Sequence, residues 1–471
     1  MSSNNIRIER DSMGEMEVPA GALYGASTMR AVLNFPISDL RFPRTFIRAL
    51  GLVKQAAART NMDLGVLDQK IGNAVVVAAQ EVIDGRHDHH FVLDIFQTGS
   101  GTSTNTNANE VIANLASRVL GGDLSSRIVH PNDHVNLGQS SNDVIPSAIH
   151  LAALIALRED LIPALQNLQG ELKKKSDEFW PVIKTGRTHL QDATPIRLGQ
   201  EFLGFAGQTE YGIRRLQRAQ EALAEVALGG TAVGTGVNTH PEFSQRTCQA
   251  LSDSTGVQIR ETGNHFQAQS SLDSVVEASG QLKTIAISLH KIANDIRFLG
   301  CGPRAGIGEI VLPEVQPGSS IMPGKINPVI AESMIQVAAQ VVGNDATVAL
   351  AGQGGYFELN TMMPVAAYNL LQSISLLAAS ANNFARQCVS GIQATQVGPQ
   401  MVERGLMLGT ALTPAIGYDA AAAIAKQASA TGRTIREVAR EETDLSDQEL
   451  EELLNPAEMT RPSLEVRGGG G

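Results

Sequence analysis

The residues best suited to chemistry lie in one stretch, positions 318–328, which reads GSSIMPGKINP. The stretch combines two hydroxyls, a lysine and a side-chain amide with two glycines, and a predicted helix follows it. Asn327 is a suitable N-cap, and Pro328 suits the first helical position. The N-terminus of a helix offers free N–H groups and partial positive charge, and Lys325 adds a full charge. The stretch therefore predicts a site for a small anion, with Ser319 close enough to act on it.

Three more hydroxyl-rich segments also precede predicted helices. They are residues 98–105 (TGSGTSTN), 139–143 (QSSND) and 186–195 (GRTHLQDATP). Any one of them alone would be interpreted as a capping box or a turn. Four such segments in one chain indicate several helix N-termini directed at one polyanionic small molecule.

One histidine and one glutamate are candidates for acid–base work. His189 is the best general acid or base because its free pKa lies near neutrality. A lone histidine is more often structural, but this one lies within a hydroxyl-rich segment. Glu332 lies five residues after Asn327, in the first turns of the predicted helix. It is placed to orient and polarise a histidine, or alternatively to interact with the helix dipole.

Two other motifs carry weaker signals. Residues 87–90 (HDHH) invite a metal interpretation, but their spacing fits neither a helical HExxH nor a zinc pattern, so a solvated loop is favoured. Residues 229–236 (GGTAVGTG) are glycine-rich, but they lack the GK[ST] ending and follow a predicted helix. A phosphate-binding loop is therefore not favoured there.

Long helices must position these segments. Helical periodicity dominates from about residue 144 onward, notably over 197–228, 272–299 and 329–385, so the predicted fold is mostly α. Strands are expected only near the N-terminus and around EIVLPEV. Because the long helices are apolar on more than one face, we expect a bundle that is also a subunit interface; a self-contained bundle is the alternative. The Gly- and Pro-rich loop at 300–328 is long enough to predict a functional segment.

The chain changes character again from about residue 397. Shorter helices are expected there, and the acidic stretch EETDLSDQELEELL predicts a solvated amphipathic helix. The final RGGGG predicts a flexible tail. The expected domains are a mixed, mostly helical N-terminal domain at 1–139, a central long-helix bundle at 140–396, and a small helical C-terminal domain with the tail at 397–471.

Composition narrows the function classes. The 471 residues carry a formal charge of −11 with no basic cluster, which argues against nucleic acid and anionic membranes as partners. No run of about 18 apolar residues predicts a membrane span, and the N-terminus has no apolar leader. Cys248, Cys301 and Cys388 lie too far apart for a metal pair or a disulfide framework. That usage suits a reducing cytosol, so a cytoplasmic location is expected.

These motifs resemble those of the fumarase/aspartase superfamily, and within it the class II fumarate hydratases of the fumarase C type. The resemblance runs from about Arg7 to about Thr460. GSSIMPGKINP is similar to the superfamily signature, and IGYDAAAAIAKQA resembles the fumarase C-terminal domain. The blocks that resemble fumarase versions are GRTHLQDATP, HPNDHVN, QSSND, KIANDIRFLGCGPRAGIGEI and YFELNTMMPVAAYNLLQS.

The resemblance implies a three-domain chain in a homotetramer, with one long central bundle built from the helices of all four chains. It implies active sites that each draw segments from three chains. The implied reaction is the reversible hydration of fumarate to L-malate, a step of the tricarboxylic acid cycle. The implied substrate is a small dicarboxylate, and neither a metal nor an organic cofactor is expected.

The resemblance also implies a role for each candidate residue. Ser319 would be the base that takes the C3 proton, with its alkoxide stabilised by Lys325 and nearby N–H groups. Lys325 and Asn327, with the helix end beside them, would stabilise a doubly charged aci-carboxylate. His189, paired with Glu332, would assist the loss or activation of water. The residues expected to bind substrate are Ser100, Gly101, Thr102, Ser140, Ser141, Asn142, Thr188, Ser320, Lys325 and Asn327.

A secondary carboxylate site is implied as well. Its pattern falls on Arg127, His130, Asn132 and Asp133. The alternative is that these residues only cap and brace a turn.

Several residues depart from the fumarase pattern toward that of aspartases. They are Thr106, Leu137, Gly138, Val329 and Ile330. Because one or two polar groups suffice to distinguish an amine from a hydroxyl, the alternative function is aspartate ammonia-lyase, which converts L-aspartate to fumarate and ammonia. His189, Ser141 and the FELN and IGYD blocks favour the hydratase. A non-catalytic protein with the same fold is a third reading, opposed by the intact set of Ser319, Lys325, Asn327, His189 and Glu332.

Overall fold

The computed structural model describes residues 6–124 and 126–462, so the predicted RGGGG tail lies outside the described residues. The described chain is mostly helical, as predicted, and each of its sheets has two strands. It divides into two compact units. Unit 1 comprises Met1–Pro163, Gly212–Ile287 and Val337–Ala379, and unit 2 comprises Ala164–Tyr211, Ser288–Gln336 and Ser380–Gly471. The three domains expected from the sequence stay a prediction.

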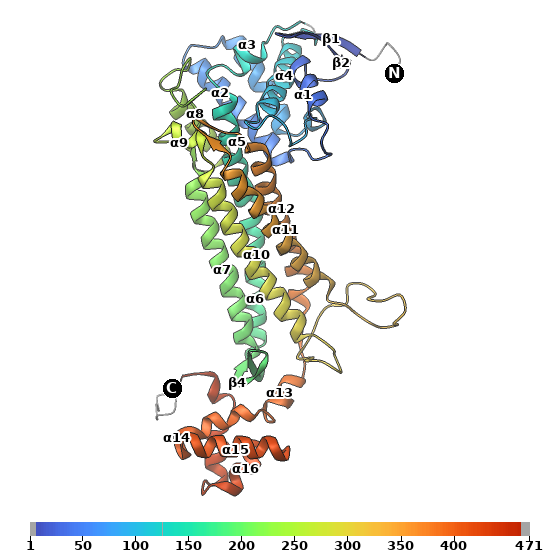
Figure 1. Ribbon diagram of the computed structural model, residues 1–471, viewed down its shortest axis with the longest axis vertical. Helices are drawn as coiled ribbons and strands as arrows, with labels where there is room; N and C mark the ends of the chain where they lie inside the picture. The colour runs from blue at the N-terminus through green and yellow to red at the C-terminus, as the bar shows by residue number, and fades with distance from the viewer. Residues whose placement is uncertain (1–5, 125, 463–471) are drawn as a thin grey trace. The chain divides into compact units, whose positions relative to one another are not determined.

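Unit 1 starts with a hairpin and a group of helices. In chain order these are β1 (Ile6–Asp11), β2 (Gly14–Pro19), α1 (Ala26–Asn34), α2 (Arg44–Asp63), α3 (Gln69–Ile83), α4 (Thr102–Val119) and α5 (Ser141–Ala156). Helix α2 packs against α3 and α5, and α3 packs against α4 (Figure 1). Leu50 and Val53 of α2 have no exposed surface. Burial of such side chains contributes roughly 1.5–3 kcal/mol each, more than intrinsic helix propensity does.

The rest of unit 1 holds shorter elements. They are β5 (Glu225–Val226) paired in parallel with β6 (Arg260–Glu261), α8 (Phe243–Thr255), α9 (His265–Ser270), and the antiparallel pair β8 (Gly355–Tyr356) and β9 (Leu359–Asn360). Short non-α turns lie at Asp88–His90, Pro131–Val135 and Leu157–Leu161.

Five long helices carry residues of both units. They are α6 (Ile162–Glu178), α7 (Leu198–Leu223), α10 (Asp273–Leu299), α11 (Val329–Gly352) and α12 (Met363–Gln387). The predicted helical segments 197–228 and 272–299 are therefore confirmed as α7 and α10, whereas the segment 329–385 forms two helices, α11 and α12. Gly352, Gly354 and Gly355 interrupt it, because glycine is a poor helix former. Gly355 also passes so close to Ser270 that a Cβ there would lie 2.2 Å from the Ser270 carbonyl oxygen.

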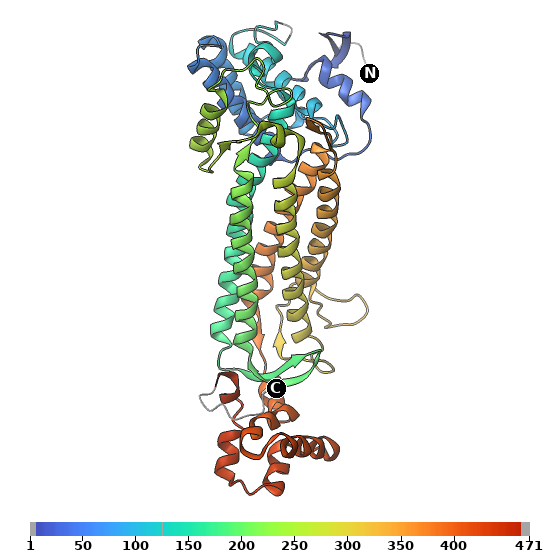
Figure 2. The same ribbon diagram turned by 60° about the vertical axis from the view of Figure 1, so that its left-hand side comes forward.

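Unit 2 contains a hairpin that the sequence reading missed. Strands β3 (Ile183–Thr188) and β4 (Gln191–Arg197) pair antiparallel where we predicted a loop running into a helix (Figure 2). The expected strand in EIVLPEV is confirmed as β7 (Ile310–Val311), which pairs with β10 (Gln393–Ala394). The remainder of the long loop separates α10 from α11.

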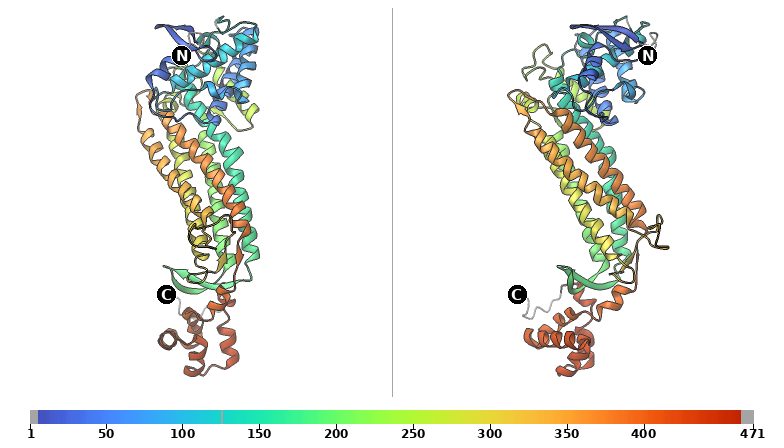
Figure 3. Two further views of the ribbon diagram at one scale, coloured as in Figure 1. Left: turned by 90° about the vertical axis from the view of Figure 1, so that its right-hand side faces the viewer. Right: turned by 45° about the vertical axis from the view of Figure 1, so that its right-hand side comes forward.

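Short helices form the end of unit 2, as predicted (Figure 3). They are α13 (Val397–Val402), α14 (Thr413–Ile416), α15 (Tyr418–Thr431), α16 (Ile435–Glu442) and α17 (Asp447–Leu453), with 3-10 turns at Val389–Gly391, Leu406–Leu412 and Glu458–Thr460. The acidic stretch is amphipathic but not fully solvated, because Leu450 and Leu454 belong to the apolar core of these helices. Within the described residues, every helix is too short or too polar to span a membrane.

Candidate active site

Three hydroxyls of unit 1 form a hydrogen-bonded chain at the starts of α4 and α5. Ser100 Oγ lies 2.7 Å from Thr102 Oγ1, which lies 2.6 Å from Ser141 Oγ. Thr102 is the first residue of α4 and Ser141 the first of α5, so two helix N-termini meet at these hydroxyls. Gly101 precedes α4 with φ 71°, which glycine adopts without strain. The partial positive charge at both helix ends favours an anion at this point.

The start of α5 is held by a capping box and a buried carboxylate. Ser140 Oγ accepts a hydrogen bond from Asn142 N (3.2 Å), and Asp143 Oδ1 accepts one from Ser140 N (2.8 Å). The second oxygen of Asp143 accepts from Gly229 N (2.9 Å) and Thr231 N (3.0 Å). Burial raises the pKa of Asp143, although these hydrogen bonds oppose the shift. The glycine-rich loop 229–236, which we did not favour as a phosphate site, thus holds Asp143.

Asn142 and Lys54 complete the surroundings of this segment. Asn142 Nδ2 donates to Ala232 O (2.8 Å). Lys54 has no exposed surface, and its Nζ donates to Asn136 Oδ1 (2.8 Å) and Gln139 Oε1 (3.0 Å). Burial lowers the pKa of Lys54 to about 7. The sequence reading missed this lysine, whose signal is a single charge in the apolar run GLVKQAAA.

In unit 2 the stretch 318–328 closes on itself before α11. Gly318 N donates to Lys325 O (2.8 Å), and Asn327 Nδ2 donates to Gly318 O (2.7 Å). Lys325 Nζ donates to Asn327 Oδ1. Asn327 therefore joins the two ends of the loop, and α11 begins at Val329, one residue later than predicted.

Two backbone N–H groups are directed at the hydroxyl of Ser319. Ser319 Oγ accepts from Ile321 N (3.3 Å) and from Met322 N (3.0 Å). Such donors stabilise negative charge on an oxygen. The neighbouring Ser320 is exposed, and Ser319 is half-buried.

His189 lies at the exposed turn of the β3–β4 hairpin. Thr188 pairs with Gln191 in the last step of the ladder, so His189 and Leu190 alone make the turn. Both have left-handed backbone angles, with φ 56° and 60°. The imidazole is therefore exposed at the end of a paired two-stranded ladder.

Glu332 lies in the first turn of α11 and is half-buried. Its N–H donates to Pro328 O (3.0 Å), which starts the helix. Within the described part of this single chain, no hydrogen bond or ion pair joins the Glu332 side chain to His189. The pairing of the two stays a prediction for the assembled protein.

The predicted secondary carboxylate site coincides with a cavity of about 390 Å³ in unit 1. Arg127, His130 and Asn132 line it, together with three carboxylates, Glu9, Asp11 and Glu110. The alternative role of these residues as turn braces also has support. His130 Nδ1 accepts from Asn132 N (3.3 Å) and Asp133 N (3.1 Å), and Arg127, with φ 44°, donates to the carbonyl of Arg10.

The histidine cluster at 87–90 is occupied by protein contacts. His87 Nε2 lies 2.7 Å from Glu81 Oε2, and Arg44 Nη1 donates to Asp88 Oδ1 (2.9 Å). Burial lowers the pKa of His90 to about 4. In the described chain no group of three His, Cys, Asp or Glu side chains is arranged to hold a metal.

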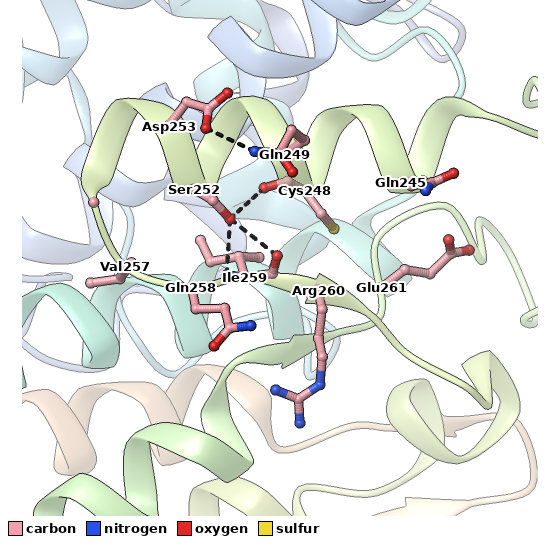
Figure 4. A pocket seen from close by; sticks show the side chains of 11 residues that line it. Gln245, Cys248, Gln249, Ser252, Asp253, Val257, Gln258, Ile259, Arg260 and Glu261 are labelled. Carbon is pink, nitrogen blue, oxygen red and sulfur yellow. Dashed lines mark hydrogen bonds between the residues drawn. The ribbon is translucent and has the colours of Figure 1, made fainter.

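A surface hollow lies beside α8 (Figure 4). None of the residues that line it is a predicted site residue. Ser252 Oγ there donates to Cys248 O (2.8 Å) and to Ile259 O (3.1 Å), and it accepts from Ile259 N (3.0 Å). Gln249 donates to Asp253 (2.8 Å). These polar groups are therefore satisfied within the fold.

The predicted catalytic and substrate-binding residues thus fall into two groups. The hydroxyls at the starts of α4 and α5 lie in unit 1 with Asn142, and the others lie in unit 2, on the β3–β4 hairpin, the 318–328 loop and the first turn of α11. That the two groups act in the same reaction stays a prediction.

Comparison with known proteins covers nearly the whole chain. A family model described as "Lyase" matches residues 14–343, and one described as "Fumarase C C-terminus" matches residues 408–461. The chain is 55% identical over 463 residues to "Fumarate hydratase class II" of Halobacterium salinarum, covering 98% of each chain. It is 51% identical to "Fumarate hydratase class II 2" of Pseudomonas aeruginosa, covering 97% of this chain and 99% of that one. The crystal structure of class II fumarase from Schistosoma mansoni superposes with a TM-score of 0.94 at 39% identity, covering 97% and 99% of the two chains.

Proposed function

The chain belongs to the class II fumarate hydratases of the lyase family, so its reaction is the reversible hydration of fumarate to L-malate, and we propose that Ser319 and His189 carry out its proton transfers. The main support for assigning this reaction is the 55% identity to a fumarate hydratase over 98% of both chains. The alternative of aspartate ammonia-lyase loses its support, since the similar relatives described above are fumarate hydratases.

In the direction from malate, Ser319 acts as an alkoxide and takes the proton from C3. The electron pair left on C3 moves into the adjacent carboxylate and gives a doubly charged aci-carboxylate. The N–H groups of Ile321 and Met322 support the alkoxide, because both already donate to Ser319 Oγ. Lys325 and Asn327 lie in the same loop and supply positive charge and a donor to the intermediate.

The second step expels water. The electron pair returns to form the C2=C3 double bond, the bond from C2 to its hydroxyl breaks, and His189 gives a proton to the departing hydroxyl. We propose that Glu332 of another chain orients this histidine. Each step uses protein side chains, so we expect the reaction to need neither a metal nor an organic cofactor.

The substrate carboxylates are held at the N-termini of α4 and α5. The linked hydroxyls of Ser100, Thr102 and Ser141 offer donors there, and the helix ends add partial positive charge. Thr188 and Ser320 contribute from the hairpin and the loop. The secondary site at Arg127, His130, Asn132 and Asp133 is proposed to bind a further carboxylate.

We propose that the active protein is a homotetramer whose active sites each draw on three chains. Ile287 of α10 and Val342 and Leu350 of α11 support this, because they are 56%, 41% and 61% exposed in the single chain. Exposed aliphatic residues along long helices mark interaction surfaces. A second copy of the same helices would cover them.

We also propose a cytoplasmic location. All three cysteines are free thiols. Burial raises the pKa of Cys248 and of Cys388 to about 12 each, so both stay protonated and resist oxidation. Unpaired thiols of this kind suit a reducing compartment.

The absorbance of the fumarate double bond tests the reaction directly. The purified full-length protein receives L-malate in one cuvette and L-aspartate in the other. Fumarate should appear in the cuvette with L-malate and not in the cuvette with L-aspartate. Fumarate from aspartate would instead establish an ammonia-lyase, and no fumarate from either would contradict the assignment.

A further inference from the structure

Four charged side chains of unit 2 form an ion network outside the groups proposed for chemistry. Lys184 and Glu309 are 1% and 4% exposed. Lys184 Nζ lies 3.0 Å from Glu309 Oε2 and 2.8 Å from Glu201 Oε1. Arg187 donates twice to Glu309, through Nη1 (3.1 Å) and Nη2 (2.7 Å). Removing one member leaves a buried charge with fewer partners, so replacement of a single member is strongly destabilising.

The two cations of this network lie three positions apart in β3, and both reach the same carboxylate. Side chains of a regular strand alternate between faces, so Lys184 and Arg187 would point in opposite directions. The β3–β4 ladder is irregular between them, because Thr185 pairs with Pro195 and Arg187 with Asp192, which leaves one extra residue in β4. Gly186 lies opposite this bulge, where a Cβ would lie 2.6 Å from Thr194 O. Both cations bind Glu309 across this irregular part of the hairpin.

Glu309 is fixed through its backbone as well as its side chain. Its N–H donates to Leu299 O (2.9 Å) at the end of α10, and its carbonyl accepts from Thr395 N (3.0 Å). It directly precedes β7, from which the chain continues into the loop that contains Ser319. Glu309 is thus the point where the base of that loop meets strand β3.

Strand β3 leads directly to the proposed acid–base group. His189 follows Arg187 by two residues, and its turn is exposed, so few contacts of its own hold it. The orientation of the turn depends on how firmly β3 is held. Two of the side chains that hold β3 are Lys184 and Arg187, both bound to Glu309.

We propose that Glu309 is a positioning residue that holds the His189 hairpin and the base of the Ser319 loop in one fixed arrangement within a chain. The inference rests on the proposed function, because it concerns the two groups assigned to proton transfer there. Glu309 touches neither the substrate nor the reacting atoms. Its effect on the reaction comes from geometry, where misplacement by about 1 Å costs on the order of a hundredfold in rate.

The test compares Glu309→Gln with a matched control, Asp345→Asn. Asp345 is also a buried carboxylate, 7% exposed, which accepts from Ser279 Oγ (2.8 Å) and Lys283 Nζ (2.5 Å). For fumarate hydration, Glu309→Gln should lower kcat about a hundredfold. KM should change by a smaller factor than kcat, because the carboxylate-binding hydroxyls at α4 and α5 are untouched and only Thr188 and Ser320 move with the hairpin and the loop. Asp345→Asn should keep kcat within about twofold of the parent.

Hydrogen–deuterium exchange provides a readout that does not depend on activity. In Glu309→Gln, peptides from both the β3–β4 hairpin and residues 312–328 should exchange faster, whereas in Asp345→Asn neither should. Faster exchange in only one of the two segments would overturn the proposal. Absence of fumarate turnover in the parent would contradict the proposed function instead, and the exchange pattern would still decide whether Glu309 links the two segments.

A milder pair of variants decides the matter if Glu309→Gln does not assemble. Arg187 is 25% exposed, so its replacement leaves less buried charge unpaired. Arg187→Gln should lower kcat at least tenfold with a smaller change in KM, and Arg187→Lys, which keeps the charge, should recover most of the loss in kcat. A kcat within twofold of the parent in Arg187→Gln would overturn the proposal, as would the same result in Glu309→Gln.

Discussion

His189 and Leu190 are the two central residues of the β3–β4 turn, and both have left-handed backbone angles, with φ 56° and 60°. Two-residue turns with this geometry favour asparagine and glycine, and bulky residues adopt it rarely. Backbone strain of this kind persists where the surrounding structure imposes it, and it gathers at functional sites. Here the strands pair up to Thr188 and Gln191 on either side of the turn, and one of the two turn residues is the proposed acid.

Replacement of His189 by asparagine isolates the imidazole from the turn. Asparagine tolerates a left-handed backbone better than most residues, so His189→Asn should fold as the parent does. Loss of a general acid or base costs about 10²–10⁴-fold, and we expect kcat to fall within or beyond that range. The initial rate of fumarate formation from malate measures the effect.

The same substitution at the next position is the control. Leu190→Asn changes the turn equally but keeps the imidazole, so its kcat should stay within about threefold of the parent and its thermal midpoint should not fall. A loss below about tenfold in His189→Asn would leave His189 with a positioning role only.

Replacement of Ser319 by alanine tests the proposed base. The loop is closed through Gly318, Lys325 and Asn327, none of which needs the Ser319 hydroxyl. Ser319→Ala should therefore keep the loop and the assembly while abolishing turnover. Exchange of the malate C3 proton with D2O, followed by NMR, should also disappear, because that step needs the base alone.

The neighbouring serine distinguishes loss of a base from loss of a binding contact. Ser320 is proposed to hold a carboxylate, so Ser320→Ala should raise KM and retain C3 proton exchange. Near-normal turnover in Ser319→Ala would exclude this serine as the base.

The sequence was sufficient for the helical architecture and for the helix-start motifs of the site. Helices α4 and α5 occur where their segments predicted, but they begin within those segments, at Thr102 and Ser141, and not after them. Capping chemistry is local, so a few residues indicate that a helix starts nearby without fixing its first residue. The hairpin around His189 was missed because GRTHLQDATP carries turn-forming polar residues without a long apolar alternation. Its strands depend on tertiary contacts, among them those of Arg187 with Glu309.

Besides the β3–β4 hairpin, the buried charged residues could not be predicted from the sequence. The apolar run around Lys54 is the one local signal of burial, nothing near Glu309 gives such a signal, and only the fold places the two residues beside Asn136 and Lys184. For Glu332 the local position was predictable, but the partner was not found, because it is not reached within one chain.

Subunit mixing tests whether the active sites are shared between chains. If Ser319 and His189 of one chain serve different sites, tetramers of inactive Ser319→Ala and inactive His189→Asn should regain activity after subunit exchange. Some sites in the mixed tetramers would then receive both intact groups. The measurement is fumarate turnover after mild dissociation and reassociation, with exchange confirmed by mass spectrometry on differently tagged chains. Demonstrated exchange without recovery would argue against shared sites.

Lys54 makes stability depend on pH in a predictable direction. Burial lowers its pKa to about 7 in the folded chain from the ordinary 10.5. Between these values the unfolded chain binds one more proton than the folded chain, so stability rises with pH across that window, by up to about 1.4 kcal/mol per pH unit. Below pH 7 the cost of burying the ammonium is fully present.

Lys54→Met removes this titration, so the thermal midpoint of the variant relative to that of the parent should change in one direction as pH rises. The midpoint of the variant minus that of the parent should be largest at pH 6 and should fall steadily from pH 7 to pH 9. The sign at any single pH is not decisive, because methionine also leaves Asn136 and Gln139 without their donor. Lys70→Met is the control, because it replaces an exposed lysine on α3 by the same residue and leaves the surroundings of Lys54 unchanged. Parallel curves for Lys54→Met and the parent would show that Lys54 stays charged in the folded protein, held by Asp143.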